Sequence, residues 1–246
     1  MSRGWIRSLH QVLSIAVKDT RIYFFKGPNL TFGLFLPLVL YWAFALDREV
    51  APDVIVPGLV AIAIFFGAGA IQAISLPLER RTGTMHTLLA APVTPLVIVL
   101  GKALAGLAFG LILASVYTAA VLLFLPLKPD LILFSLAALL SSFCFSAFGL
   151  CLAAPFRDIP QAMPPATVVR IVMVFLSGTF APLEAASPLW LFVARLLPLT
   201  YAVDALRQGV NGPVSAPEFA LDLGVLFLYA IVFLLVTAWL LKKGDV

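Results

Sequence analysis

The chain has 246 residues, of which 62% are hydrophobic and only 11% are charged, and its mean hydropathy is +1.09. Soluble globular domains carry about 25% charged residues, so this composition excludes a soluble protein. The apolar runs are continuous, whereas the strands of a membrane barrel alternate apolar and polar residues in segments of about ten. The composition therefore predicts an all-α polytopic membrane protein.

The N-terminal residues 1–28 precede the first apolar run and predict an amphipathic helix at the membrane surface. Within residues 3–23, apolar and polar side chains fall on different faces at helical spacing. The apolar face comprises Trp5, Leu9, Val12, Ala16 and Tyr23, and the polar face comprises Arg3, Arg7, Gln11, Ser14, Lys18 and Arg21. A basic face opposite Trp and Leu is typical of an interfacial helix. Such a helix can act as an anchor for the first span or as part of a docking platform for a motor protein.

Residues 29–246 are predicted to form one transmembrane domain with six membrane spans. A helix that crosses the hydrocarbon core needs about 20 apolar residues, with a range of about 17 to 25. The candidate spans are Leu30–Leu46, Val54–Leu78, Leu96–Leu125, Leu131–Ala154, Ala162–Ala181 and Phe219–Leu241. Lys102, near the start of the third span, is expected to extend to the interface, and Arg170 is placed toward the inner end of the fifth.

The distribution of basic residues predicts the orientation of the spans. With six spans both termini lie on one side of the membrane, and 12 of the 16 Lys and Arg residues fall on that side. Because Lys and Arg are enriched on the cytoplasmic side, both termini are predicted to be cytoplasmic. The net charge of +4 follows from this topology, and no nucleic-acid partner is needed to explain it.

The polar segment Glu79–Pro92 lies between the second and third spans and predicts a short surface helix. Leu88 and Leu89 fall together on one side, and Glu79, Arg80 and Arg81 stand at its start. A helix held at the membrane surface by two spans can be pushed by a soluble partner.

A second unusual segment, Pro182–Glu218, separates the fifth and sixth spans by 37 residues. It contains the apolar piece Leu189–Leu199, which is too short to cross the membrane. Short apolar pieces are often re-entrant or interfacial, and their backbone must be shielded by protein. This piece is predicted to close the outer end of a transport path.

No nucleotide site is expected in the chain. A phosphate-binding loop needs Gly-x-x-x-x-Gly-Lys-Ser/Thr, and the Gly101-Lys102 pair is followed by Ala103. Cys144 and Cys151 lie inside an apolar run, so neither a disulfide nor a metal site is expected. Gradient-driven carriers usually keep an ionisable group at the membrane midplane, and no Asp or Glu lies deep in a predicted span. A membrane enzyme would need an interfacial cluster of His, Asp or Glu. An external motor is favoured, with a gradient-driven carrier and a non-transporting scaffold as the alternatives.

Two blocks of sequence carry a resemblance to a known family. Glu79-Arg80, Gly83-Thr84 and Leu88-Leu89-Ala90-x-Pro92 form the first block. Leu176-Ser177-Gly178-Thr179-Phe180-Ala181-Pro182-Leu183, followed by Leu197 to Arg207, forms the second. In this order, with six spans and an N-terminal amphipathic helix, the chain resembles ABC-2 type transporter permeases.

The resemblance implies a half-transporter that exports an amphiphilic cargo such as a drug, a lipid or a glycan. It implies pairing with a second copy or a related permease, in the cytoplasmic membrane of a bacterium or archaeon, and a separate ATPase subunit that binds Mg-ATP. The implied ATPase-coupling residues are Glu79, Arg80, Gly83, Thr84, Leu88, Leu89 and Pro92. The implied external gate comprises Gly178, Pro182, Pro198, Tyr201 and Arg207.

Five residues inside the spans are weaker candidates for the substrate path. Phe65, Phe66, Tyr117 and Phe148 either line an apolar path or pack in the core, and aromatic residues in spans usually pack. Gln72 either faces an inner cavity or bonds to a neighbouring helix.

Overall fold

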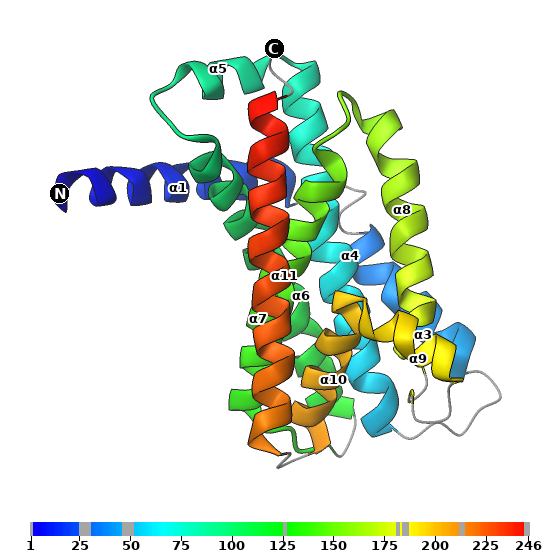
Figure 1. Ribbon diagram of the computed structural model, residues 1–246. Coiled ribbons are helices and arrows are strands. Elements are labelled where there is room, and N and C mark those ends of the chain that lie inside the picture. Colours follow the sequence, from blue (N-terminus) through cyan, green and yellow to red (C-terminus); the bar gives the residue numbers. More distant parts are fainter. Residues whose placement is uncertain are drawn as a thin grey trace.

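The computed structural model describes residues 2–24, 31–45, 52–124, 127–180, 183, 187–211 and 215–243. Within these ranges every regular element is a helix (Figure 1), which confirms the all-α class. Five long helices run side by side: α4 Pro52–Arg81, α6 Pro95–Phe124, α7 Leu131–Ala153, α8 Ile159–Leu176 and α11 Ala216–Lys243. Each is long and apolar enough to cross a membrane, so five of the six predicted spans correspond to one such helix each.

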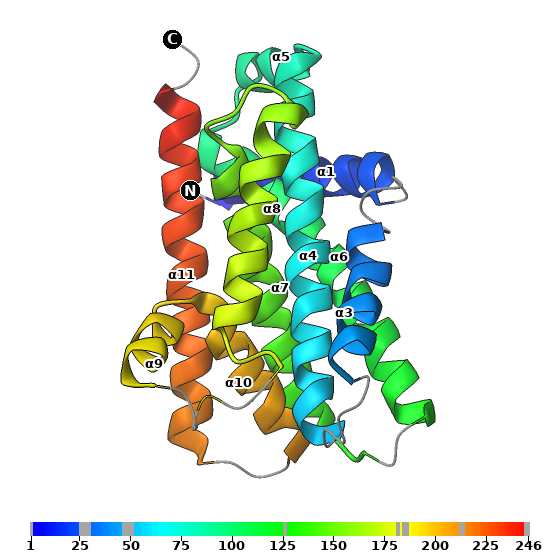
Figure 2. The same cartoon turned by 90° about the vertical axis from the view of Figure 1, so that its right-hand side faces the viewer.

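The first predicted span is the exception. The described part of Leu30–Leu46 consists of a π-helical turn, Thr31–Phe35, and α3, Leu36–Ala45. These 15 residues lie along α4 (Figure 2). At about 1.5 Å per residue they span roughly 22 Å, which is less than the thickness of the hydrocarbon core. By length and composition the described residues contain five membrane spans, or six if the bent pair α9 and α10 counts as one.

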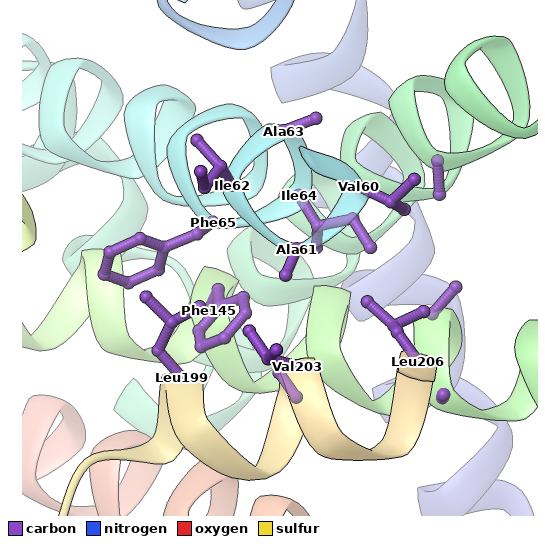
Figure 3. Close-up of a cluster of buried hydrophobic side chains, with 14 of the residues drawn as sticks. Val60, Ala61, Ile62, Ala63, Ile64, Phe65, Phe145, Leu199, Val203 and Leu206 are labelled. Atoms are coloured by element: carbon purple, nitrogen blue, oxygen red, sulfur yellow. The ribbon is translucent and has the colours of Figure 1, made fainter. Parts of the chain in front are cut away.

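The helices α9, Pro188–Arg195, and α10, Pro198–Asn211, meet at an angle of 91°. Pro198 starts α10, where the missing N–H of proline is tolerated. On α10 the side chains of Leu199, Val203 and Leu206 are fully buried in a cluster that includes Phe65 of α4 and Phe145 of α7 (Figure 3). The apolar piece predicted to be re-entrant therefore continues into a helix that is packed in the protein core.

Helix α4 is the centre of the bundle. In the most apolar 18-residue stretch of α4, 89% of the residues are buried inside the chain, whereas the value for the corresponding stretch of α11 is 22%. Helix α1, Ser2–Tyr23, lies across the long helices, near the end of the bundle that carries α5, Thr84–Ala90 (Figure 1). We call this end the α5 end, and the opposite end, with α9 and α10, the α10 end.

The buried face of α1 agrees with the predicted apolar face at Val12 and Tyr23 but not at Leu9. Val12, Ile15, Asp19 and Tyr23 are buried, whereas Leu9 is 60% exposed. The reason is the close contact of α1 with Gly101 of α6, where an added Cβ atom would lie 2.7 Å from the Cβ of Ile15. This contact rotates α1 so that an acidic residue, Asp19, points into the bundle.

Candidate functional site

Four charged side chains meet at the α5 end, where α1 crosses α4 and α6. The ammonium of Lys102 on α6 lies 2.9 Å from Asp19 Oδ2 and 2.7 Å from Glu79 Oε2. The ammonium of Lys18 lies 3.0 Å from Asp19 Oδ1 and 2.5 Å from Glu79 Oε1. Lys102–Asp19 and Lys18–Glu79 have hydrogen-bond geometry, and the other two contacts are ion pairs. We call these four residues the Lys102 cluster.

The Lys102 cluster is buried and electrically balanced. Lys102 and Asp19 are 0% exposed and Glu79 is 3% exposed. A buried charge is strongly unfavourable unless it is paired, and here each carboxylate contacts both ammonium groups. Removing one member of such a cluster leaves an uncompensated charge and destabilises the fold by about 3–5 kcal/mol. The cluster therefore holds α1 against α4 and α6.

Lys18 lies at the rim of the Lys102 cluster, with its side chain partly exposed. Burial alone would lower its pKa. The hydrogen bond to Glu79 and the charges of Asp19 and Glu79 together outweigh this effect, so the pKa of Lys18 is raised above 10.5. Lys18 therefore stays charged throughout the physiological range of pH.

The predicted extension of Lys102 to the interface is wrong. Gly101 lets the backbone of α1 approach α6 closely, and α1 then covers Lys102 and supplies Asp19 as its counterion. Glu79 belongs to the last turn of α4, and its carboxylate contacts two lysines of the same chain. The structure thus places Glu79 between elements of this chain.

Arg80 ties the end of α4 to the connection between α7 and α8. Its Nη1 donates to the carbonyl oxygen of Ala154 and, at 2.9 Å, to that of Phe156. Since Glu79 holds α1 and Arg80 holds the start of the α7–α8 connection, two adjacent residues fix the last turn of α4 on two sides.

Helix α5 follows a turn at Gly83, whose φ of +75° favours glycine. The hydroxyl of Thr84 lies 2.7 Å from that of Thr82 and donates to the carbonyl of Glu79 at 3.4 Å. On the inner side Met85 is buried in an apolar cluster that includes Ile98 and Val99 of α6. Leu88 packs against this cluster.

The outer side of α5 is exposed, and the residues that follow the helix return to the bundle. Gln11 of α1 donates to the carbonyl of Pro92 at 3.3 Å. Arg81, His86 and Thr87 are exposed, and the side chain of Leu89 lies outside the described structure. The segment predicted to be a surface helix is thus held on α4 and, through Gln11, on α1, with a polar outer face that the sequence does not single out.

Four of the weak substrate-path candidates lie in the core. The ring of Phe65 is 4.7 Å from that of Phe145 and 5.8 Å from that of Phe148. The Tyr117 hydroxyl donates to the carbonyl of Leu34, and Phe66 is also buried.

Gln72 takes the second of its two possible roles, because it bonds to neighbouring helices. Its Nε2 donates to the carbonyl of Lys102 at 2.5 Å and to Ser146 at 3.3 Å, and its Oε1 accepts from Ser75. Gln72 therefore links α4 to α6 and α7.

The α10 end carries an open polar cleft of about 850 Å³. The structure brings three of the predicted gate residues together here. Tyr201 and Arg207 line the cleft, and Arg207 donates to the carbonyl of Gly178 at 3.2 Å and pairs with Asp204 at 3.3 Å. Pro198 is buried at the start of α10, and Pro182 lies outside the described residues.

Sequence reasoning missed Asp19 and misplaced Arg170. Asp19 lies in the polar run Lys18-Asp19-Thr20-Arg21, so its neighbours in the sequence do not mark it as a buried residue. Arg170 lies on the buried face of α8 and donates to the carbonyl of Gly69, in the middle of α4. The sequence predicts Arg170 toward the inner end of a span 162–181, whereas in α8, Ile159–Leu176, it lies past the middle of the helix.

Comparison with known proteins gives the family. The family model of the ABC-2 type transporter matches residues 12–211, a region that includes the whole Lys102 cluster and α10. The inner membrane transport permease YadH of Escherichia coli strain K12 is 31% identical over 194 residues, which are 77% of this chain and 74% of that protein.

Two further relatives share shorter regions. The probable multidrug ABC transporter permease YbhR of Escherichia coli strain K12 is 27% identical over 157 residues, covering 63% of this chain and 42% of that protein. Nodulation protein J of Neorhizobium galegae is 30% identical over 105 residues, covering 42% of this chain and 39% of that protein. With the apolar helices described above, these matches show that the chain belongs to the ABC-2 type transporter family and is a multi-pass membrane permease.

Proposed function

We propose that the chain is the membrane subunit of an ATP-driven exporter and works with a separate ATPase subunit that binds Mg-ATP. The cargo is an amphiphile, and the functional unit contains a second copy of the chain or a related permease. Both termini, α1 and α5 lie on the cytoplasmic side. The observation that carries this proposal is the Lys102 cluster, which joins α1 to two spans at the α5 end.

The first step of the mechanism is contact between the ATPase and the outer face of α5. His86 and Thr87 of α5 are exposed, as is Arg81, the last residue of α4, while Met85 and Leu88 pack inward. A force on α5 is therefore transmitted to the bundle through packed side chains. The polar outer face suits a soluble partner, which a cytoplasmic ATPase subunit is.

The second step is transmission into the spans. Thr84 is bonded to the backbone of Glu79, and Glu79 is paired with lysines on α1 and α6. When α5 moves, α1, α4 and α6 move with it, because separating them would expose unpaired buried charges. In this mechanism Glu79 and Arg80 act as positioning residues for α5, in place of the direct contact with the motor suggested by the sequence.

The third step is opening of the α10 end. Helix α10 packs on α4 and α7 through Leu199, Val203 and Leu206, so a tilt of α4 changes the support of α10. The contact of Arg207 with the carbonyl of Gly178 holds the cleft in its present form and would break on opening.

Purification of the tagged full-length chain from native membranes in mild detergent tests this proposal. We expect a stoichiometric soluble ATPase subunit and Mg-ATP hydrolysis in the preparation, with the companion identified by mass spectrometry. The variant Arg81→Glu is expected to lose the companion while it stays in the membrane. Arg195→Glu changes an exposed arginine at the α10 end and serves as the matched control. A chain that is isolated alone, without hydrolysis under several gentle conditions, would contradict the proposal.

A further inference from the structure

Arg170 is a buried cation in the middle of the bundle. It is 4% exposed and lies 11 residues after the start of α8, or about 16 Å along the helix axis. Its partner Gly69 is equally central in α4. Since the hydrocarbon core is about 30 Å thick, the guanidinium lies near its centre, where an ionisable residue is rare and usually functional.

The hydrogen-bonding capacity of Arg170 is largely unused. Nη2 donates to the carbonyl of Gly69 at 2.9 Å, and the buried Nε has no acceptor. Among the residues that the structure describes, no carboxylate pairs with Arg170. This contrasts with the Lys102 cluster, where every buried charge has a counterion. A guanidinium has five N–H donors in a planar fork, so Arg170 has donors available for an anion.

The surroundings of Arg170 allow a ligand to reach it. On α4 the neighbouring positions are small, Gly69, Ala70 and Ala73, and a void of about 10 Å³ lies beside the guanidinium. Helix α8 lies at the edge of the bundle, since only 28% of the residues in its most apolar stretch are buried inside the chain. A void of this size holds about one water molecule, so a larger anion binds only after α8 moves away from α4.

We propose that Arg170 binds an oxyanion, a phosphate or a carboxylate, of the cargo's head group as that group passes the centre of the membrane. This inference rests on the proposed export of an amphiphile and specifies its charge. Moving a charged group through hydrocarbon is strongly unfavourable, and a fixed guanidinium at the same depth offsets this cost by bidentate hydrogen bonding. The cargo is then an anionic amphiphile.

Equilibrium binding to the purified full-length permease in phosphatidylcholine nanodiscs, without ATP, tests this site. The probes are tail-labelled lysophosphatidic acid, which is anionic, and lysophosphatidylcholine with the same tail, which is zwitterionic. We expect the wild type to prefer the anionic probe by about tenfold or more, because a charge-assisted hydrogen bond is worth this factor. Arg170→Gln should lose the preference. Arg157→Gln, which changes an exposed arginine before α8, should keep it.

Several results would overturn the assignment. They are equal binding of both probes by the wild type, an unchanged preference in Arg170→Gln, and displacement of the probe by millimolar inorganic phosphate, which would identify a free anion as the occupant. If Arg170→Gln fails to fold, photo-crosslinking of the wild type with a head-group diazirine probe decides the question. Labelling of Met163 or Thr167, which line the void with Arg170, supports the site, and labelling confined to other regions contradicts it. Because binding is measured without ATP, its result is independent of whether an ATPase companion is found.

Discussion

The ammonium of Lys102 lies 2.9 Å from the carboxylate of Asp19, and both side chains are completely buried although 83 residues separate them in sequence. Together with the ion pair between Lys18 of α1 and Glu79 of α4, this contact makes α1 an integral part of the bundle. An interfacial helix that only anchored the first span would need no buried ion pair. The contact therefore favours the second role considered for α1, as part of a platform for a motor protein.

The Lys102 cluster gives a prediction for stability. Asp19→Asn leaves two lysines facing one carboxylate, and we expect a loss of about 3–5 kcal/mol in the free energy of unfolding. The double variant Asp19→Asn/Lys102→Met restores charge balance and should be more stable than Asp19→Asn. Unfolding in mixed micelles with increasing dodecyl sulfate measures both. Arg21→Gln, an exposed change on the same helix, should be neutral, and equal losses for all three variants would contradict the role of the cluster.

The pH dependence of stability follows from Lys18. Its pKa is raised in the folded protein, so the stabilisation is complete below the unfolded value and is lost as the pH rises through the folded value. We expect the melting temperature to be insensitive to this group up to pH 10.5 and to fall above it. Lys18→Arg should resist this fall, because a guanidinium stays protonated. Identical alkaline profiles for the two proteins would show that Lys18 does not contribute.

The hydrogen bonds of Arg80 predict how well the backbone of the α7–α8 connection is protected from hydrogen exchange. Arg80→Ala removes two bonds to the carbonyls of Ala154 and Phe156, and hydrogen bonds from a charged group contribute about 1.5–3 kcal/mol. We expect faster amide hydrogen exchange in residues 153–160 at the α7–α8 connection, with little change at the α10 end. Exchange that increases evenly over the whole chain would instead indicate general destabilisation.

The packing of α10 gives a fourth prediction. Leu206→Ala removes a fully buried side chain between α10 and α7, and such truncations typically cost about 2–5 kcal/mol. Leu189→Ala is the control, because Leu189 of α9 is 75% exposed. Thermal unfolding of the purified proteins compares them. If both variants have the same melting temperature, the packing of α10 does not contribute to the stability of the core.

The sequence predicts the spans well, since the ends of the long apolar runs lie within five residues of the ends of α4, α6, α7, α8 and α11. It predicts poorly where charges on separate helices find one another. Lys102 was assigned to the interface because long basic side chains near helix ends usually extend there. The tertiary fold brings two carboxylates to Lys102. Asp19 reaches it because α1 packs on Gly101, and Glu79 reaches it from the end of α4.

The same limit applies to the two ends of the bundle. The piece Leu189–Leu199 was recognised as too short to span, but its 91° bend and the core packing of α10 depend on tertiary contacts. The segment 31–45 is a second case, because the described part of an apolar run predicted as one continuous span is a π-helical turn followed by a ten-residue helix.

The most direct test of coupling through the Lys102 cluster is the distance between spin labels at Leu123→Cys of α6 and Leu189→Cys of α9, both exposed sites. The labels are placed on a chain in which Cys144 and Cys151 are replaced by Ala, so that only the two introduced cysteines react. The labelled permease is purified with its ATPase companion, and the distance is compared in the absence and presence of ATP and vanadate. With the native cluster the distance distribution should shift on trapping. With Asp19→Asn the companion should still hydrolyse ATP while the shift is lost. An equal shift in the Asp19→Asn protein would contradict transmission of the ATPase motion through the cluster.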